Sequence, residues 1–411
     1  MSRHLPDLGD ADWLRTPATR KTFAILDKDS EPSRIVGGAV RNALAGLAVE
    51  ELDFATPLAP ESVMRRAAEA GCKAVPTGIE HGTVTLVADG VPHQVTTLRE
   101  DVETDGRHAV VRFGTDWTAD ARRRDFTVNA LSVDAAGKVY DPLEGFADIL
   151  ARRVRFIGDP GQRIAEDRLR VLRFFRFNAE FGQGGFDPEG LSAAIRARND
   201  LRELSAERIG QEMRRLASAP RAFETLGRMQ DSGILGVILA GVAYLGPFER
   251  LLRFDPDAGL PLRLAAFGCR VEEDVERLTQ RLRLSNAERD AMLAEVVAAR
   301  RWRMPTSERN ARASLYRLGP AAWPDVVALA FAWGTADADD KAWQALRALP
   351  ALWPPPRFPL SGADVLGAGA AHGPAVGQIL EALESWWIGQ DFVPDATALR
   401  QRLQQMVTAA Q

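Results

Sequence analysis

The chain has 411 residues, of which 46% are hydrophobic and 26% charged, and its 52 Lys+Arg against 56 Asp+Glu give a net charge of -4. These proportions are typical of a folded globular protein and exclude a mini-protein, a fibrous repeat and a long disordered chain, while the length predicts two to three domains. Because the net charge is slightly negative, a polyanion would have to bind at a local basic patch.

The first 140 residues predict a small α/β unit. Short runs rich in β-branched residues predict four strands, at residues 34–36, 52–56, 83–87 and 93–98. Helical stretches are expected between them, from about Ala39 and from about Pro60.

The first strand runs into a glycine pair that suits phosphate binding. Gly37 and Gly38 stand at a strand-to-helix turn, where glycine lets backbone N–H groups approach a phosphate and the helix start adds favourable partial charge. Arg41, about one turn into that helix, is expected to reach a phosphate oxygen.

The second strand is expected to carry two acidic residues, Glu51 and Asp53. Residues two apart on a strand point to the same face, so both carboxylates are expected to bind a divalent metal. Hard oxygen ligands favour Mg²⁺ or Mn²⁺, which serve phosphoryl and nucleotidyl transfer. The alternative is a tight turn beside two carboxylates that face solvent.

Two charged segments follow. Thr96–Phe113 mixes acids, bases and a glycine, which predicts either a solvated hairpin or a loop that closes over the reacting end as a lid. In Ala121–Leu131, ARRRDFTVNAL, a run of arginines precedes a buried-looking FTVNAL, and Arg124 is expected to contact triphosphate or ribose. Tyr140–Pro160 is rich in turn residues and is interpreted as a structural connector.

From about Arg163 onward the apolar residues follow the helical period, so the remaining two thirds of the chain are expected to be helical. Loops are expected at 182–190 and 353–362, where prolines and glycines cluster. Domain boundaries are expected near residues 145, 225 and 355. Glu203–Ala217 is interpreted as a structural helix that begins at Ser205.

Glu166–Phe177, EDRLRVLRFFRF, is the most informative helical segment. On one helix, Asp167 and Arg170 share a face, Arg173 continues the stripe and Arg176 is nearby. A carboxylate acceptor beside a guanidinium donor can match the Watson–Crick edge of a base. The alternative is an intrahelical salt-bridge ladder, worth about 0.2–0.5 kcal/mol per pair.

Five segments, in this order, resemble motifs of the class II tRNA nucleotidyltransferase and bacterial poly(A) polymerase family: 35–56, 96–113, 121–131, 140–160 and 166–177. The resemblance implies an α/β nucleotidyltransferase head with a small mixed sheet like that of polymerase β, followed by an all-α neck, body and tail. The implied domains are a catalytic head at 1–145, a neck at 146–225, a body at 226–355 and a tail at 356–411.

The resemblance also implies a role for each site residue. Glu51 and Asp53 are the catalytic metal ligands. Asp167 and Arg170 read the base without a nucleic-acid template and so select CTP and ATP, with Arg173 and Arg176 supporting the nucleotide. The nucleotide-binding set as a whole comprises Gly37, Gly38, Arg41, Arg124, Asp125, Asn129, Asp167, Arg170, Arg173 and Arg176.

The function implied is template-independent addition or repair of the 3′-terminal CCA of tRNA. The tRNA 3′-OH attacks the α-phosphate of CTP or ATP in a two-metal mechanism, and pyrophosphate leaves. Alternatives within the family are a poly(A) polymerase and an enzyme that adds only CC or only A. The neutral, Gln-rich C-terminus favours CCA addition, because a poly(A) polymerase of this family more typically carries a basic tail.

Three positions depart from the familiar form of these motifs, all near the expected metal site. Asn42 replaces an acid, Glu51 replaces an aspartate, and Gln94 stands where a glutamate is usual. Glu51 keeps its charge but adds a methylene, whereas the other two changes each remove a negative charge. A catalytically weakened protein that still binds tRNA is therefore a further alternative.

The expected partners are CTP, ATP and tRNA, held at its acceptor end and elbow. Residues 151–220 carry 14 basic against 10 acidic residues, which supports an RNA-facing neck. Neither a membrane nor a protein partner is implied. Cys72 and Cys269 match no zinc or disulfide spacing, and with no apolar signal region near the N-terminus we expect a cytoplasmic protein.

Overall fold

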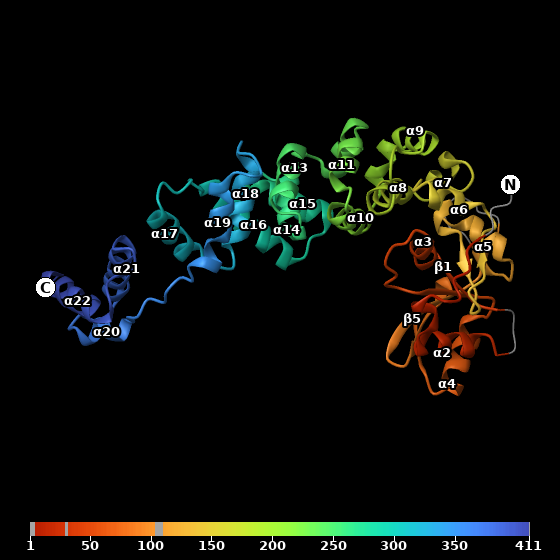
Figure 1. Cartoon of the computed structure of the whole chain (residues 1–411), viewed down its shortest axis with the longest axis horizontal. Coiled ribbons are helices and arrows are strands. Elements are labelled where there is room, and N and C mark those ends of the chain that lie inside the picture. Colours follow the sequence, from red (N-terminus) through yellow and green to blue (C-terminus); the bar gives the residue numbers. More distant parts are fainter. Residues whose placement is uncertain (1–4, 29–31, 103–109, 411) are drawn as a thin grey trace. The chain divides into compact units, whose positions relative to one another are not determined.

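The computed structural model describes residues 5–28, 32–102 and 110–410. The chain divides into two compact units, Met1–Ile238 and Leu239–Gln411. Figure 1 labels the helices and strands of the chain and colours them along the sequence. The boundaries expected near 145, 225 and 355 stay predictions. None of the helices in the described part of the chain is long and apolar enough to cross a lipid bilayer.

The first unit contains a mixed seven-stranded sheet in the order β3-β4-β5-β2-β1-β8-β9. Only β2 and β5 pair in parallel, and the other neighbours are antiparallel. All four predicted strands are present, with ends that differ from the prediction by no more than two residues. The strands are β1 (Arg34–Val36), β2 (Asp53–Thr56), β3 (Lys73–Gly78), β4 (Thr83–Ala88), β5 (Val91–Thr97), β8 (Ser132–Val133) and β9 (Val139–Tyr140).

Short helices accompany this sheet, and the two that were predicted begin at Gly38 and Pro60. Phe23 of α2 packs edge to face on Phe54 of β2, with ring centroids 5.0 Å apart, and this contact joins α2 to the central strands. The α-helices are α1 (Asp12–Arg15), α2 (Pro17–Leu26), α3 (Gly38–Leu44), α4 (Pro60–Glu69), α5 (Trp117–Arg123) and α6 (Gly145–Leu150), with 3₁₀ turns η1 (Ile79–His81) and η2 (Thr127–Asn129).

The segment 96–113, predicted as a hairpin or a lid, contains two strands that pair with each other. β6 (Arg99–Val102) and β7 (Val110–Phe113) form a separate two-stranded antiparallel sheet, which agrees with the hairpin. The turn between them, 103–109, lies outside the described residues, and closure of this segment over the site stays a prediction.

No further strand follows β9 among the described residues, which confirms the predicted change to helices. Ser205 caps α10 by accepting a hydrogen bond from the backbone N–H of Arg208, as its sequence pattern predicts. The helices are α7 (Pro160–Glu166), α8 (Leu169–Glu180), α9 (Pro188–Arg196), α10 (Ala206–Ser218), α11 (Ala222–Asp231) and α12 (Ile234–Leu239), with a 3₁₀ helix η3 (Arg198–Glu203).

The prediction of one continuous helix through Asp167 was wrong. Helix α7 ends at Glu166 and α8 begins at Leu169. Asp167 between them has an extended backbone, with φ -151° and ψ 107°, and its Oδ1 accepts a hydrogen bond from the backbone N–H of Leu169 at 3.0 Å. An aspartate that binds a backbone N–H two residues on competes with the helical hydrogen bond, and this explains the break.

Aromatic packing holds α8 against the end of the sheet unit. The ring of Phe126 lies 4.9 Å from that of Phe156 and 5.3 Å from that of Phe177 on α8, measured between centroids. Phe174, also on α8, stacks on Phe156 at 5.3 Å. All four rings are buried, so α8 has one well-defined position relative to the FTVNAL segment.

The second unit contains helices and no strand among its described residues. Phe254 stacks on Phe331 at 4.2 Å between centroids, and the fully buried Trp323 donates from Nε1 to the backbone oxygen of Leu346 at 2.6 Å. The helices are α13 (Leu245–Phe254), α14 (Leu260–Gly268), α15 (Glu272–Leu282), α16 (Asn286–Arg301), α17 (Glu308–Leu318), α18 (Trp323–Trp333), α19 (Lys341–Leu352), α20 (Gly362–Gly367), α21 (Pro374–Gly389) and α22 (Ala396–Ala410).

Candidate functional site

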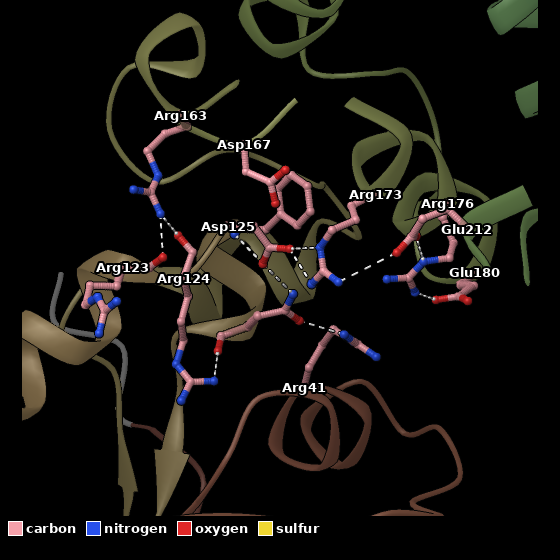
Figure 2. A network of polar contacts seen from close by, with 12 residues as sticks. Arg41, Arg123, Arg124, Asp125, Arg163, Asp167, Arg173, Arg176, Glu180 and Glu212 are labelled. Atoms are coloured by element: carbon pink, nitrogen blue, oxygen red, sulfur yellow. Dashed lines mark hydrogen bonds and ion pairs between the residues drawn. The ribbon is translucent and has the colours of Figure 1, made fainter. Parts of the chain in front are cut away.

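One pocket of about 900 Å³ in the first unit is lined by all twelve predicted site residues. Eight arginines and five acidic residues line it, so it is strongly polar. Its walls come from the turn after β1, the start of β2, the segment 123–129 and helices α8 and α10. Figure 2 shows the polar network on the α8 side of this pocket.

The glycine pair forms the turn between β1 and α3. Gly37 has φ +70° and ψ -123°, a conformation that a residue with a side chain rarely adopts. A Cβ at this position would lie 3.3 Å from Nη1 of Arg124. Because Gly37 has no side chain, its backbone is open to the pocket directly beside the guanidinium group of Arg124.

The two predicted metal ligands line the same pocket, one from a strand and the other from the chain before that strand. Asp53 is the first residue of β2 and pairs with Val36 of β1 and with Gln94 of β5. Glu51 was predicted on that strand but precedes it, because ladder pairing with both neighbours begins only at Asp53. Both side chains are exposed toward the pocket.

Desolvation by the surrounding protein raises the pKa of Asp53, and the nearby negative charge of Glu51 raises it further, whereas Arg124 lowers it. The negative charges of Glu51 and Asp53 repel each other, and a cation bound between the two carboxylates would relieve this repulsion. No three His, Cys, Asp or Glu side chains of the described residues form a ready-made metal cage. Mg²⁺ typically binds one or two carboxylates together with substrate phosphates and water, so Glu51 and Asp53 fit such an ion.

Asp125 and its partners form the centre of the network in Figure 2. The buried carboxylate of Asp125 accepts hydrogen bonds from Nε of Arg173 at 2.7 Å and from Nδ2 of Asn129 at 3.1 Å. Asn129 in turn accepts from Nη1 of Arg41 at 2.6 Å. Burial raises the pKa of Asp125, but the charge of Arg173 and these hydrogen bonds outweigh it, so the pKa lies below its usual value.

Arg41 is largely buried, and its guanidinium lies over the ring of Phe177, with Cζ 5.2 Å from the centroid. Burial lowers the pKa of Arg41 to about 10, so this side chain still carries a positive charge at neutral pH. Its contact with Asn129 shows that Arg41 supports the pocket wall while it lines the pocket.

Asp167 pairs with an arginine other than the one expected. Its carboxylate binds Nη2 of Arg208 on α10, with both oxygens within 3.0 Å. Arg170 instead donates to Glu166 at 2.6 Å and to the backbone oxygen of Arg163 at 2.7 Å. Both predicted base readers line the pocket, but the break between α7 and α8 removes them from a common helix face.

Arg176 has a structural setting that its sequence position did not reveal. Its side chain is 1% exposed and pairs with Glu212 of α10 at 2.5 Å and with Glu180 at 2.6 Å. Glu212 also approaches Arg173 at 3.8 Å. Arg176 thus joins α8 to α10 behind the pocket wall, and its charge is neutralised by two carboxylates.

Sequence reasoning missed three pocket arginines, Arg123, Arg208 and Arg215. Arg123 belongs to the run before Asp125, whereas the other two lie in the segment 203–217 that was interpreted as structural only. The signal that could have identified Arg208 and Arg215 was the presence of arginines on a predicted helix that follows the predicted base-reading segment. Sequence reasoning also missed Arg163. Its Nη2 donates to the backbone oxygens of Arg123 at 2.5 Å and Arg124 at 2.6 Å and so fixes the backbone at the end of α5 (Figure 2).

Residues 33–155 match the family model described as the poly(A) polymerase head domain. The chain is 34% identical over 372 residues to the protein named CCA tRNA nucleotidyltransferase 1, mitochondrial, of Danio rerio, with 88% of this chain and 85% of the relative covered. The human protein of the same name is 31% identical over 384 residues, with 91% and 87% covered.

The fold resembles that of solved structures along almost its whole length. The structure of the Bacillus stearothermophilus CCA-adding enzyme in complex with CTP matches with a TM-score of 0.76 and 25% identity, covering 96% of this chain and 98% of that one. The Thermotoga maritima CCA-adding enzyme matches with a TM-score of 0.71, 18% identity and 94% of each chain covered, and here the likeness concerns the fold alone.

Proposed function

Because the chain belongs to the class II CCA tRNA nucleotidyltransferase family, we propose that it adds CCA to the 3′ end of tRNA from CTP and ATP. It is an enzyme, a nucleotidyltransferase with a poly(A) polymerase head domain. The observation that carries the proposal is the single pocket in which two carboxylates face a wall of arginines.

The arginine wall explains how the nucleotide is held. Gly37 and Gly38 leave backbone open to the triphosphate, and Arg124 lines the pocket beside Gly37 while its Nη2 pairs with Asp120 at 3.2 Å. Arg41 adds a cation whose position is set by Asn129. Pre-positioned cations around a triphosphate stabilise the charge that develops on the leaving pyrophosphate.

The family uses divalent metals, and we assign the ion to Glu51 and Asp53, with Mg²⁺ favoured and Mn²⁺ as the alternative. When bound there, the ion supplies a Lewis acid for the attacking hydroxyl and the phosphate oxygens. The carboxylates position the 3′-hydroxyl of tRNA at the α-phosphate. Attack of the 3′-oxygen on the α-phosphorus forms the new phosphodiester bond and breaks the bond between the α-phosphorus and the bridging oxygen, so pyrophosphate leaves and the hydroxyl proton passes to water.

Base selection belongs to Asp167 and Arg170 in this proposal, and Arg208 is a positioning residue for Asp167. The ion pair with Arg208 holds the Asp167 carboxylate at the pocket wall, where it offers acceptor oxygens to a base edge. Arg170 offers a donor from the first turn of α8. This division of roles replaces the common helix face that the sequence predicted.

The decisive experiment uses purified protein, Mg²⁺ and tRNA transcripts that end before CCA, after C or after CC, with CTP, ATP or both. We expect two C and one A to be added, followed by a stop, and no addition in excess EDTA. Long A tails would favour a poly(A) polymerase, and addition of only CC or only A a partial enzyme. tRNA binding without any extension would favour the catalytically weakened protein.

Replacing Arg208 with alanine is expected to weaken base selection. The carboxylate of Asp167 loses its ion pair and its fixed orientation, so discrimination against UTP and GTP should fall about tenfold, the effect of losing one good base contact. The measurement is kcat/KM for each nucleotide on tRNA lacking CCA. Arg208→Lys should recover part of the selectivity.

The matched control is Arg228→Ala, because Arg228 is exposed on α11 and lies 4.0 Å from Asp231. Its removal should leave selectivity unchanged. Equal discrimination in Arg208→Ala and the wild type would contradict the assignment of Arg208.

The compartment stays a proposal. The sequence pattern favours the cytoplasm, and the Danio rerio and human relatives are named as mitochondrial proteins. Fractionation of the source cells with antibody detection tests it.

A further inference from the structure

The second unit contains a groove of about 700 Å³ between α16 and α17, both labelled in Figure 1. Leu293, Ala294, Val297 and Ala298 of α16 and Leu318 of α17 give it an aliphatic lining. All five side chains are at least partly exposed, and Leu293 is 36% exposed. No residue that lines the groove also lines the nucleotide pocket of the first unit, so the proposed function leaves this surface unexplained.

Helix α16 has more apolar surface than its own unit buries. Met292, Val296 and Ala299 are buried and form the face that packs into the unit. The four aliphatic groove residues of α16 repeat with the same helical period and form a second apolar stripe beside the first. A helix at the surface of a globular unit normally carries polar residues there, and a contiguous apolar surface bordered by polar groups is typical of an interaction site.

Three exposed arginines border the aliphatic surface: Arg301, Arg303 and Arg317. None of the three pairs with a carboxylate among the residues that the structure describes, and Arg303 donates only to two backbone oxygens. Asp290 also lines the groove, but its carboxylate pairs with Arg289 at 2.8 Å. The border of the groove therefore carries an uncompensated positive charge, which attracts an acidic partner.

The aliphatic surface and the charged border together select the class of partner. Leucine-like side chains cover such a surface while carboxylates pair with its arginines, whereas a nucleic acid supplies phosphates but no aliphatic groups. The α16 residues of the groove run from Asp290 to Arg301, a distance of about 16 Å, or about three turns of a helix.

A second copy of this chain does not match the groove. No helix in the described part of the chain carries two exposed large hydrophobic side chains, so the copy offers no apolar stripe of its own. We propose that the groove between α16 and α17 binds an amphipathic, acidic helix of another protein. Apolar residues spaced i, i+3 or i+4 and i+7 fill the aliphatic surface, and carboxylates beside them pair with Arg301 and Arg317.

The first test measures binding of a synthetic helix to the full chain. The probe is a fluorescein-labelled peptide of about 14 residues with leucines at i, i+3, i+4 and i+7 and glutamates beside them. We expect a Kd of about 10 μM by fluorescence anisotropy, and binding about tenfold weaker for a matched peptide with lysines in place of the glutamates. Failure of the glutamate peptide to bind, or equal binding of the two peptides, would overturn the inference.

Charge reversal places the binding site on the protein. The double variant Arg301→Glu/Arg317→Glu should invert the preference, so that the lysine peptide binds more tightly than the glutamate peptide. The matched control is Arg309→Glu, because Arg309 is exposed on α17 and does not line the groove. This control should bind both peptides like the wild type. An unchanged preference in the double variant contradicts the inference.

Val297→Glu tests the aliphatic surface itself. Val297 is half-buried at the groove, so the fold has room for the longer side chain, and the new charge should weaken binding of the glutamate peptide about tenfold. Thermal melting at the wild-type temperature shows that the variant is folded. Wild-type affinity for the glutamate peptide in this variant would show that the peptide binds elsewhere.

Two further measurements separate this partner from the other occupants. We expect tRNA lacking CCA to leave the bound peptide in place, and we expect Arg301→Glu/Arg317→Glu to keep the tRNA affinity of the wild type. Displacement by tRNA, or weaker tRNA binding in the double variant, would assign the groove to RNA and overturn the inference. Self-association of the wild type that Val297→Glu abolishes would assign it to a second copy, with the same consequence.

Discussion

Asp53→Asn is expected to abolish nucleotide incorporation, with a fall in kcat of about three orders of magnitude. The substitution removes one of the two carboxylates that we propose as ligands of the divalent ion, and metal activation is worth several kcal/mol, at about 1.4 kcal/mol for each factor of ten. Asp53 cannot be replaced by a neighbour, because pairing with β1 and β5 fixes its backbone. The measurement is single-turnover incorporation of labelled CTP into tRNA lacking CCA.

The control for Asp53 is Glu69→Gln, which removes an exposed carboxylate on α4 that lies 3.9 Å from Lys28. This variant should incorporate CTP at the wild-type rate. Asp53→Asn should keep the thermal stability of the wild type, because its side chain is exposed toward the pocket. Incorporation within tenfold of the wild type would contradict the metal assignment.

Glu51→Asp addresses the departure at the neighbouring ligand. If the extra methylene had silenced the enzyme, shortening the side chain would switch incorporation on in an otherwise inactive protein. Glu51 precedes β2 and is not held by the ladder, so its backbone can adapt to the longer side chain. We therefore expect Glu51→Asp to change single-turnover incorporation of CTP into tRNA lacking CCA by no more than about tenfold, and incorporation that appears only in this variant would favour the catalytically weakened protein.

Glu212→Gln is expected to lower the free energy of unfolding of the first unit by about 3 kcal/mol. The reason is Arg176, which is 1% exposed and depends on Glu212 and Glu180 to neutralise its charge. Removing one carboxylate leaves a buried guanidinium only partly compensated. Urea denaturation followed by circular dichroism, with thermal melting as a second probe, gives the change.

The matched control is Glu203→Gln, since Glu203 pairs with Arg168 at 3.3 Å and both side chains are exposed. An exposed pair contributes about 0–1 kcal/mol, so this variant should unfold like the wild type. Equal losses for the two variants would show that Arg176 is satisfied without Glu212.

Several features could be predicted from local sequence. The strands at 34–36 and 83–87 and the helix starts at Gly38, Pro60 and Ser205 follow from periodicity and capping residues within a few positions. Gly37 adopts the positive φ that favours glycine. The motif resemblance also predicts that all twelve site residues line one pocket, because the fold of the family brings these motifs together at one site.

Other features depended on packing between distant segments. Asp167 pairs with Arg208, 41 residues away, and Arg176 with Glu212, 36 residues away. Local spacing instead favoured a pair between Asp167 and Arg170. The hydrogen bond from the Leu169 N–H broke the helix, so the three-residue spacing no longer placed the two side chains on one face.

Residue types within short segments of the sequence therefore determined the strands near 34–36, 52–56, 83–87 and 93–98 and the helix starts, and the motif resemblance determined which residues line the arginine-rich pocket. Tertiary structure alone decided the partners of the arginines and the presence of the groove between α16 and α17. Both depend on where the helices pack, and aromatic contacts between segments far apart in the chain set the positions of α8 and of the end of α16.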